Sequence, residues 1–115
     1  MQLPVQISFR NMDPTAWIEE KIREKAAKLE RTFDRITRCD VVIEAPHHDH
    51  RKGRLYHVRI DMTVPGGKLA VRGDDSHANE DVRAAIRDAF DAARRQLEDW
   101  IERKRETPVE AAAAD

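Results

Sequence analysis

The stretch RLYHVRIDMTVPGGKLAV, residues 54–71, decides the fold, because apolar and polar side chains alternate on both sides of a two-glycine turn. A period of two is typical of a strand that buries one face. Pro65, Gly66 and Gly67 supply the tight turn between a strand over 54–64 and a strand over 68–73. The apolar face of the longer strand comprises Tyr56, Val58, Ile60, Met62 and Val64. The stretch predicts an antiparallel hairpin with one buried side.

Two more segments, residues 5–11 and 38–45, alternate in the same way. Their apolar faces are Val5, Ile7 and Phe9 in the first, and Cys39, Val41 and Ile43 in the second. The turn-rich PHHDHRKG sequence at 46–53 predicts a hairpin between the second of these strands and the strand at 54–64. If Ala45 pairs with Arg54, the expected cross-strand pairs are Val41 with Val58, Ile43 with Tyr56, Asp40 with Arg59, and Val42 with His57.

Helical spacing marks residues 12–33 and 79–106. The apolar positions are Ile18, Ile22, Ala26, Leu29 and Phe33 in the first helix, and Val82, Ile86, Ala89, Ala93, Leu97 and Trp100 in the second. We expect Asp13 and Asn79 to be the N-caps, with Pro14 in the first turn of the first helix and Glu80 and Asp81 in that of the second. Trp17 and Trp100 are expected at the margins of the apolar stripes.

The order of elements predicts an α+β fold, β-α-β-β-β-α, with one four-stranded mixed sheet and both helices packed on one face. A right-handed crossover through the first helix makes the first two strands parallel. The length suits one domain over residues 1–106. Residues 107–115 have no apolar period, so we expect a disordered tail.

The chain holds 21 Lys and Arg against 22 Asp and Glu, a formal net charge of −1. Nucleic-acid binding would therefore depend on local segregation of charge. Cys39 is the single cysteine, and no apolar run approaches the roughly 20 residues that span a bilayer. We expect a cytoplasmic protein without a membrane partner.

Charge on the first helix is segregated. Lys21, Lys25, Lys28, Arg31 and Arg35 project between about 220 and 340° from Ile18, whereas Glu19, Glu20 and Glu30 lie at about 100 to 200°. A basic ridge of this kind can follow an RNA backbone. The alternative is a solvated face with pairs such as Glu24 and Lys28, worth about 0.2 to 0.5 kcal/mol each. In the second helix Arg83, Arg87 and Arg94 share a flank, and whether the two basic flanks converge is open.

His47, His48, Asp49 and His50 have the side-chain types of a metal site, with His57 nearby in sequence. A glycine-containing loop holds imidazoles poorly in tetrahedral geometry, so we expect a solvated hairpin tip and no metal. Ser8 and Ser76 lack a nucleophile motif, and the two glycines at 66–67 are too short for a phosphate loop. We expect neither an enzyme nor a cofactor nor a small-molecule substrate.

Four segments in this order, AAKLERTFDRI (26–36), VVIEA (41–45), VPGGKLAV (64–71) and DVRAAIRDAFDAARRQLEDW (81–100), resemble the ribosome hibernation-promoting factors and the ribosome-associated inhibitor. The resemblance implies a β-α-β-β-β-α domain that binds 16S rRNA of the small ribosomal subunit, blocks the tRNA and mRNA sites, and silences idle ribosomes under stress or in stationary phase. Long members of the family add a C-terminal dimerisation domain, so we expect a short form.

In this family basic residues of both helices contact rRNA. By position Lys25, Lys28, Arg31, Arg95 and Arg103 keep that basic character. The full candidate set is Lys21, Lys25, Lys28, Arg31, Arg35, Arg51, Lys52, Arg87, Arg94, Arg95 and Arg103. Ala92 and Asp99 stand where relatives often place lysines, and Arg83 replaces a common aromatic residue. The rival hypothesis is a protein-interaction domain, a homodimer through the exposed sheet face; salt dependence of binding distinguishes the two.

Overall fold

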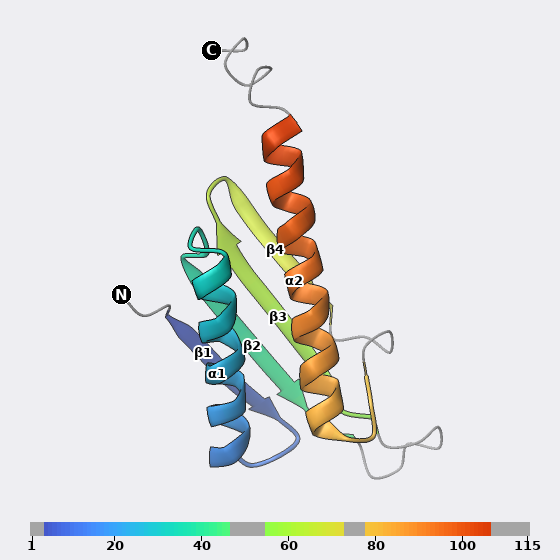
Figure 1. Ribbon diagram of the computed structural model, residues 1–115. Helices are drawn as coiled ribbons and strands as arrows, with labels where there is room; N and C mark the ends of the chain where they lie inside the picture. The colour runs from blue at the N-terminus through green and yellow to red at the C-terminus, as the bar shows by residue number, and fades with distance from the viewer. Residues whose placement is uncertain (1–3, 47–54, 73–77, 107–115) are drawn as a thin grey trace.

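The computed structural model describes residues 4–46, 55–72 and 78–106. Its elements are β1 (Val5–Arg10), α1 (Ala16–Thr32), β2 (Arg38–Glu44), β3 (His57–Val64), β4 (Gly67–Val71) and α2 (Val82–Glu106). The strands form one sheet in the order β1-β2-β3-β4, and both helices cover the same face of it (Figure 1). The predicted α+β fold is confirmed.

Strand pairing follows the prediction in direction but not in register. β1 and β2 are parallel, and β3 is antiparallel to both β2 and β4. Val41 lies opposite Ile60, and Ile43 lies opposite Val58, two residues from the expected register. The predicted register was wrong because β2 ends at Glu44, and the backbone of Tyr56 instead exchanges hydrogen bonds with that of Asn79, at 2.8 and 3.3 Å. A shift of two residues leaves every side chain on its predicted face.

The core fills the space between the sheet and the two helices. Its largest fully buried side chains are Ile22, Cys39, Val41, Ile43, Ile60, Met62, Val71, Ile86 and Leu97. The predicted stripe of α1 is buried from Ile18 to Phe33, and Val82 and Trp100 of α2 are partly buried against the same core. Burial raises the pKa of the Cys39 thiol to about 12, and the nearby carboxylates of Asp40 and Asp61 add to the effect.

Both helices begin later than expected. Thr15, in extended backbone, is the N-cap residue of α1, and its carbonyl accepts the first helical hydrogen bond from the Glu19 amide at 3.1 Å. Asp81 caps α2, because its Oδ1 accepts a hydrogen bond from the Arg83 amide at 2.9 Å. The predicted caps Asp13 and Asn79 were wrong. Glu80 and Asp81 precede the first turn of α2.

Two side chains connect elements that are distant in sequence. Gln96 of α2 donates from Nε2 to the carbonyl of Ala70 in β4 at 2.7 Å. Asn11, at a φ of 60°, donates from Nδ2 to the carbonyls of Ala45 and Pro46 at 3.3 and 3.1 Å. No helix within the described residues combines the length and apolar character that crossing a bilayer requires.

Candidate nucleic-acid interface

The basic flank of α1 presents its cations to solvent. Lys21, Lys28 and Arg31 are exposed, and Lys25 is half-buried. Among the described residues, none of these four forms an ion pair with a carboxylate. The Glu24–Lys28 pair, which was the example given for the solvated-face alternative, is not formed. These charges are therefore available to an anionic partner.

Arg35 does not belong to this flank. The helix ends at Thr32, and Phe33, the C-cap residue, donates its amide to the Leu29 carbonyl at 2.7 Å. Arg35 lies in the turn that follows, where it is exposed. Its predicted position on the helical ridge was wrong, because the buried Phe33 and Ile36 require the chain to leave the helical path and enter β2.

The cations of α2 are partly neutralised. Arg87 pairs with the adjacent Asp88, and Arg94 pairs with Glu98 one turn later, each at 3.2 Å. Arg95 is exposed and, within the described part of the chain, has no ion pair. Arg103 is exposed near the C-terminal end of the helix. The predicted α2 residues thus divide into paired Arg87 and Arg94 and unpaired Arg95.

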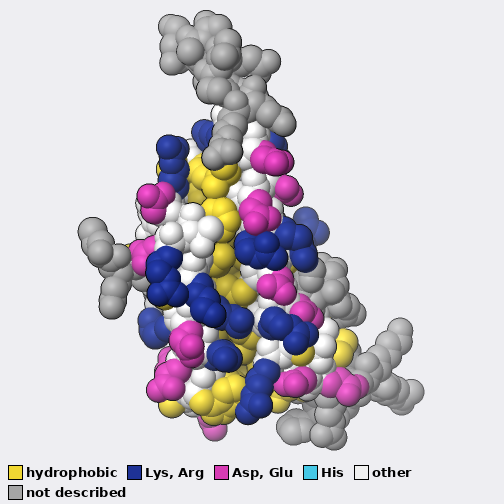
Figure 2. All heavy atoms as spheres, in the orientation of Figure 1, with side chains coloured by type: hydrophobic (Ala, Val, Ile, Leu, Met, Phe, Trp, Pro, Cys, Tyr) yellow, Lys and Arg dark blue, Asp and Glu magenta, His cyan; other side chains and the backbone are white. Residues whose placement is uncertain are grey.

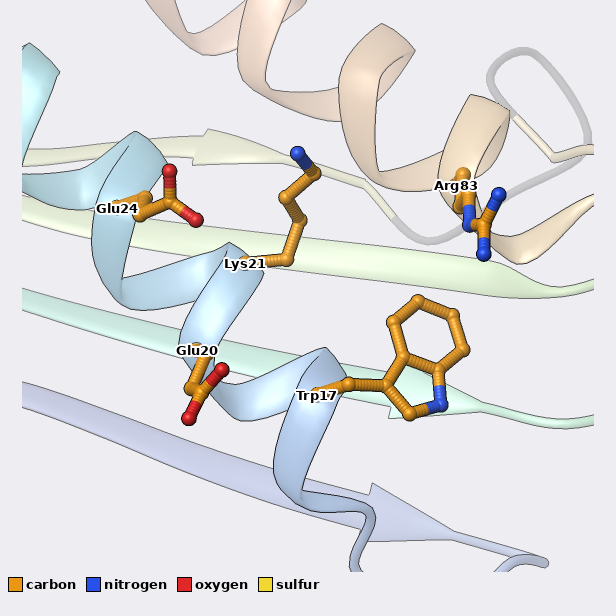
Figure 3. Close-up of a pocket in the computed structure, with 5 residues that line it drawn as sticks. All are labelled: Trp17, Glu20, Lys21, Glu24 and Arg83. Carbon is orange, nitrogen blue, oxygen red and sulfur yellow. The ribbon is translucent and has the colours of Figure 1, made fainter.

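The basic flanks of the two helices converge. Lys21 and Glu24 of α1 and Arg83 of α2 line a single hollow of about 310 Å³ (Figure 3). Lys25 and Lys28 project within about 40° of Lys21 around α1, and Arg87 and Arg94 project within about 40° of Arg83 around α2. Figure 2 shows the result, with Lys and Arg side chains over both helices on either side of a strip of hydrophobic atoms. We call the surface formed by Lys21, Lys25, Lys28, Arg83, Arg87 and Arg94 the interhelical basic face.

One contact at this face was not predicted. The guanidinium of Arg83 lies 5.3 Å from the centre of the Trp17 ring, a distance typical of a cation–π interaction. The sequence signal was the replacement of a common aromatic residue by Arg83, but nothing in helical spacing pairs it with Trp17. Contact between the two depends on how the helices pack.

The opposite, helix-free face of the sheet carries charges in pairs. Arg38 contacts Asp40 at 2.9 Å and Arg59 contacts Asp61 at 3.1 Å, in each case two residues along the same strand. The hydrogen bond to Asp40 raises the pKa of Arg38. A second hollow, of about 390 Å³, lies on this face and is lined by Arg10, Val42, Glu44, His57, Arg59 and Asp61. Among the described residues that line this hollow, Val42 is the one aliphatic side chain.

The remaining residues that the sequence singled out are of two kinds: those that lie outside the described residues, and Ala92 and Asp99 of α2. Arg51, Lys52 and the histidines of residues 47–50 lie outside the described residues. Within the described segments, no three His, Cys, Asp or Glu residues are placed to hold a metal ion. Ala92 is only 6% exposed, so it belongs to the core. Asp99 is exposed on α2 and adds a negative charge there.

Comparison with known proteins gives relatives of one kind. The family model described as sigma 54 modulation protein / S30EA ribosomal protein matches residues 5–105. The ribosome hibernation promotion factor of Deinococcus radiodurans is 35% identical over 94 residues, which are 80% of this chain and 46% of that protein. The ribosome hibernation promoting factor of Pseudomonas putida is 28% identical over 112 residues, covering 97% of this chain and 99% of that one. This chain therefore spans about half the length of the first relative and nearly all of the second.

Solved structures show the same fold. A ribosomal subunit interface protein from Coxiella burnetii superposes with a TM-score of 0.70 at 12% identity, over 87% of this chain and 99% of that one. The N-terminal domain of Thermus thermophilus Protein Y gives a TM-score of 0.63 at 22% identity, with the same coverage of both chains. These likenesses concern architecture, whereas the sequence match over residues 5–105 concerns descent. The chain belongs to the sigma 54 modulation protein / S30EA ribosomal protein family.

Proposed function

We propose that this protein is a ribosome hibernation factor of the cytoplasm, which binds 16S rRNA of the small subunit and blocks the tRNA and mRNA sites. The observation that carries the proposal is the interhelical basic face, where Lys21, Lys25 and Lys28 of α1 have no ion-pair partner among the described residues and Lys21 lines a hollow shared with α2. The names of the Deinococcus and Pseudomonas relatives support the same function.

Binding would depend on phosphate neutralisation. Each lysine that contacts a phosphate releases condensed counterions, so the affinity falls as salt rises. Arg87 and Arg94 already contact carboxylates, and each must exchange that partner for a phosphate. Arg95 and the α1 lysines need no such exchange, so we expect them to provide most of the electrostatic attraction.

Inhibition would be steric and needs no catalytic group. Side chains on stiff helices read the shape and backbone of folded RNA, since the deep groove of A-form RNA excludes them from the base edges. A rigid domain seated in this way occupies the space that tRNA and mRNA require. We infer a stress or stationary-phase regulator that is not an enzyme.

The test is cosedimentation of the tag-free protein with 30S subunits, 50S subunits and 70S ribosomes, each at low and moderate salt. We expect salt-sensitive pelleting that is lost in a Lys25→Glu, Lys28→Glu, Arg31→Glu variant. The matched control is Arg10→Glu, Lys68→Glu, Arg72→Glu, which changes the net charge equally at exposed positions off the helical face. This control should still pellet.

Three results would contradict the proposal. Wild-type protein that stays in the supernatant under every condition would exclude ribosome binding and favour the rival protein-interaction domain. Equal losses in the two charge-reversed variants would show that net charge matters and the interhelical basic face does not. Pelleting with 50S subunits alone would place the contact on the other subunit.

A further inference from the structure

Trp17 is the one large hydrophobic side chain that the structure leaves exposed among the described residues, with 44% of its surface open. It projects from the first turn of α1 into the hollow between the helices. Figure 3 shows its indole next to the Arg83 side chain of α2. The fraction remains open although Arg83 lies 5.3 Å from the ring centre. Part of the ring surface is therefore free for a second stacking partner.

The other side chains of this hollow are charged. Lys21 extends from α1 toward α2, and Glu20 and Glu24 complete the lining on the α1 side (Figure 3). An indole offers a stacking surface, Lys21 and Arg83 offer positive charge for a phosphate, and the carboxylates accept hydrogen bonds only. The volume of about 310 Å³ lies at the lower end of the range for small-molecule sites.

We propose that the Trp17 hollow binds one unpaired nucleobase that carries an exocyclic amino group. The base would stack on the open part of the indole, its amino group would donate to Glu20 or Glu24, and Lys21 with Arg83 would hold the adjoining phosphate. This inference rests on the proposed function, because it makes the hollow the single-strand contact at the end of the interhelical basic face.

A protein partner fits this hollow less well. An apolar side chain docked on Trp17 would desolvate Glu20 and Glu24 without giving either a hydrogen bond, which is costly. An aminated base satisfies one carboxylate and stacks at the same time. Uracil offers two carbonyl acceptors and no amino group, so the carboxylates would disfavour it. Base identity should therefore matter at this position, unlike at a plain stacking platform.

The first experiment follows Trp17 fluorescence in the Trp100→Phe variant, which leaves Trp17 as the single tryptophan. Single-stranded hexacytidylate and hexauridylate are titrated at low salt up to about 1 mM, above the range of ordinary non-specific binding. The two bases have the same ring size and differ at the amino group. We expect quenching by hexacytidylate at a concentration severalfold lower than by hexauridylate. Glu20→Gln, Glu24→Gln should reduce that preference.

The second experiment measures ribosome cosedimentation of Trp17→Leu and Trp17→Phe, with Trp100→Phe as the control that should bind like wild type. Because stacking carries no charge, Trp17→Leu should lower the affinity roughly tenfold at each salt concentration without changing the salt slope. Trp17→Phe keeps an aromatic ring and should lose less. Thermal unfolding checks that each variant is folded.

The outcomes separate this inference from the proposed function. Absence of quenching by either oligonucleotide, or equal quenching by both, overturns the nucleobase site. Ribosome binding by Trp17→Leu equal to that of wild type overturns it as well, while leaving the hibernation proposal intact. Loss of ribosome binding in Trp17→Leu without any quenching would assign Trp17 to a protein contact instead. Wild-type protein that never pellets contradicts the hibernation proposal and leaves the fluorescence result to decide the base site.

Discussion

The two faces of this molecule arrange their charged side chains in opposite ways. On the helix-free face, Arg38 and Arg59 each lie within 3.1 Å of an aspartate two residues along the same strand. On α1, Lys21, Lys25 and Lys28 lie together, and none has an ion pair within the described residues. Arg38 and Arg59 are thus neutralised by their own strands, whereas the three lysines of α1 are left for a partner.

The difference comes from the repeats of strand and helix. Residues two apart on a strand point to the same side, so an Arg-x-Asp sequence pairs with itself. Residues three or four apart share one side of a helix, so a lysine at every turn builds a ridge of like charge. A net charge near zero conceals both arrangements. The net charge alone would have argued against a nucleic-acid partner.

The largest expected effect is on thiol reactivity at two positions of β2, Cys39 on the helix side of the sheet and Val42 on the helix-free side. Because burial raises the pKa of Cys39 from 9.0 to about 12, its thiolate fraction near pH 8 falls roughly 1000-fold. We expect a disulfide reagent to modify Cys39 very slowly in the folded protein and rapidly in urea. A Val42→Cys variant, with its thiol on the half-exposed face, should react at once with one equivalent.

The same pKa shift has a consequence for stability. The folded state holds the proton of the Cys39 thiol more tightly than the unfolded state. The resulting contribution to the free energy of unfolding is fully present below pH 9 and is lost as the pH rises toward 12. Modification of native Cys39 at the rate seen in urea would contradict the burial of β2 against the helices.

A smaller effect tests where the core lies. Ile22 of α1 is fully buried between the helices and the sheet. Ile22→Ala should lower the free energy of unfolding by about 2 to 5 kcal/mol, since it removes methyl groups and leaves a cavity. Val42→Ala, on the helix-free face, should cost less than about 1 kcal/mol. Urea unfolding measures both, and equal losses would mean that a second layer covers the outer face.

The smallest effect compares single cations of the two faces. Lys28→Gln removes an unpaired charge, so the slope of log affinity for ribosomes against log salt should become shallower by about 1. Arg59→Gln removes a charge that Asp61 already neutralises and should leave the slope unchanged. Salt titrations of ribosome cosedimentation give both values. A shallower slope in Arg59→Gln alone would move the RNA contact to the helix-free face.

Periodicity predicted the elements, their order and their buried faces, because one apolar stripe per element has only one way to be covered. It did not predict the register of β2 with β3, since the Tyr56–Asn79 bridge draws Tyr56 away from the hairpin. Nor could it place Trp17 beside Arg83, which are 66 positions apart and meet only through helix packing. The basic flank of α1 was readable from helical angles, but its orientation toward α2 was not.

The hydrogen bond from Gln96 to the Ala70 carbonyl bears on how the sheet ends. β4 is an edge strand, and edge strands with unpaired carbonyls recruit further strands and nucleate aggregates. A side-chain amide from α2 occupies one such carbonyl at 2.7 Å, so an incoming strand would have to break that bond before it could pair there. The helix that carries Arg83, Arg87 and Arg94 thus also protects this edge of the sheet against pairing with further strands.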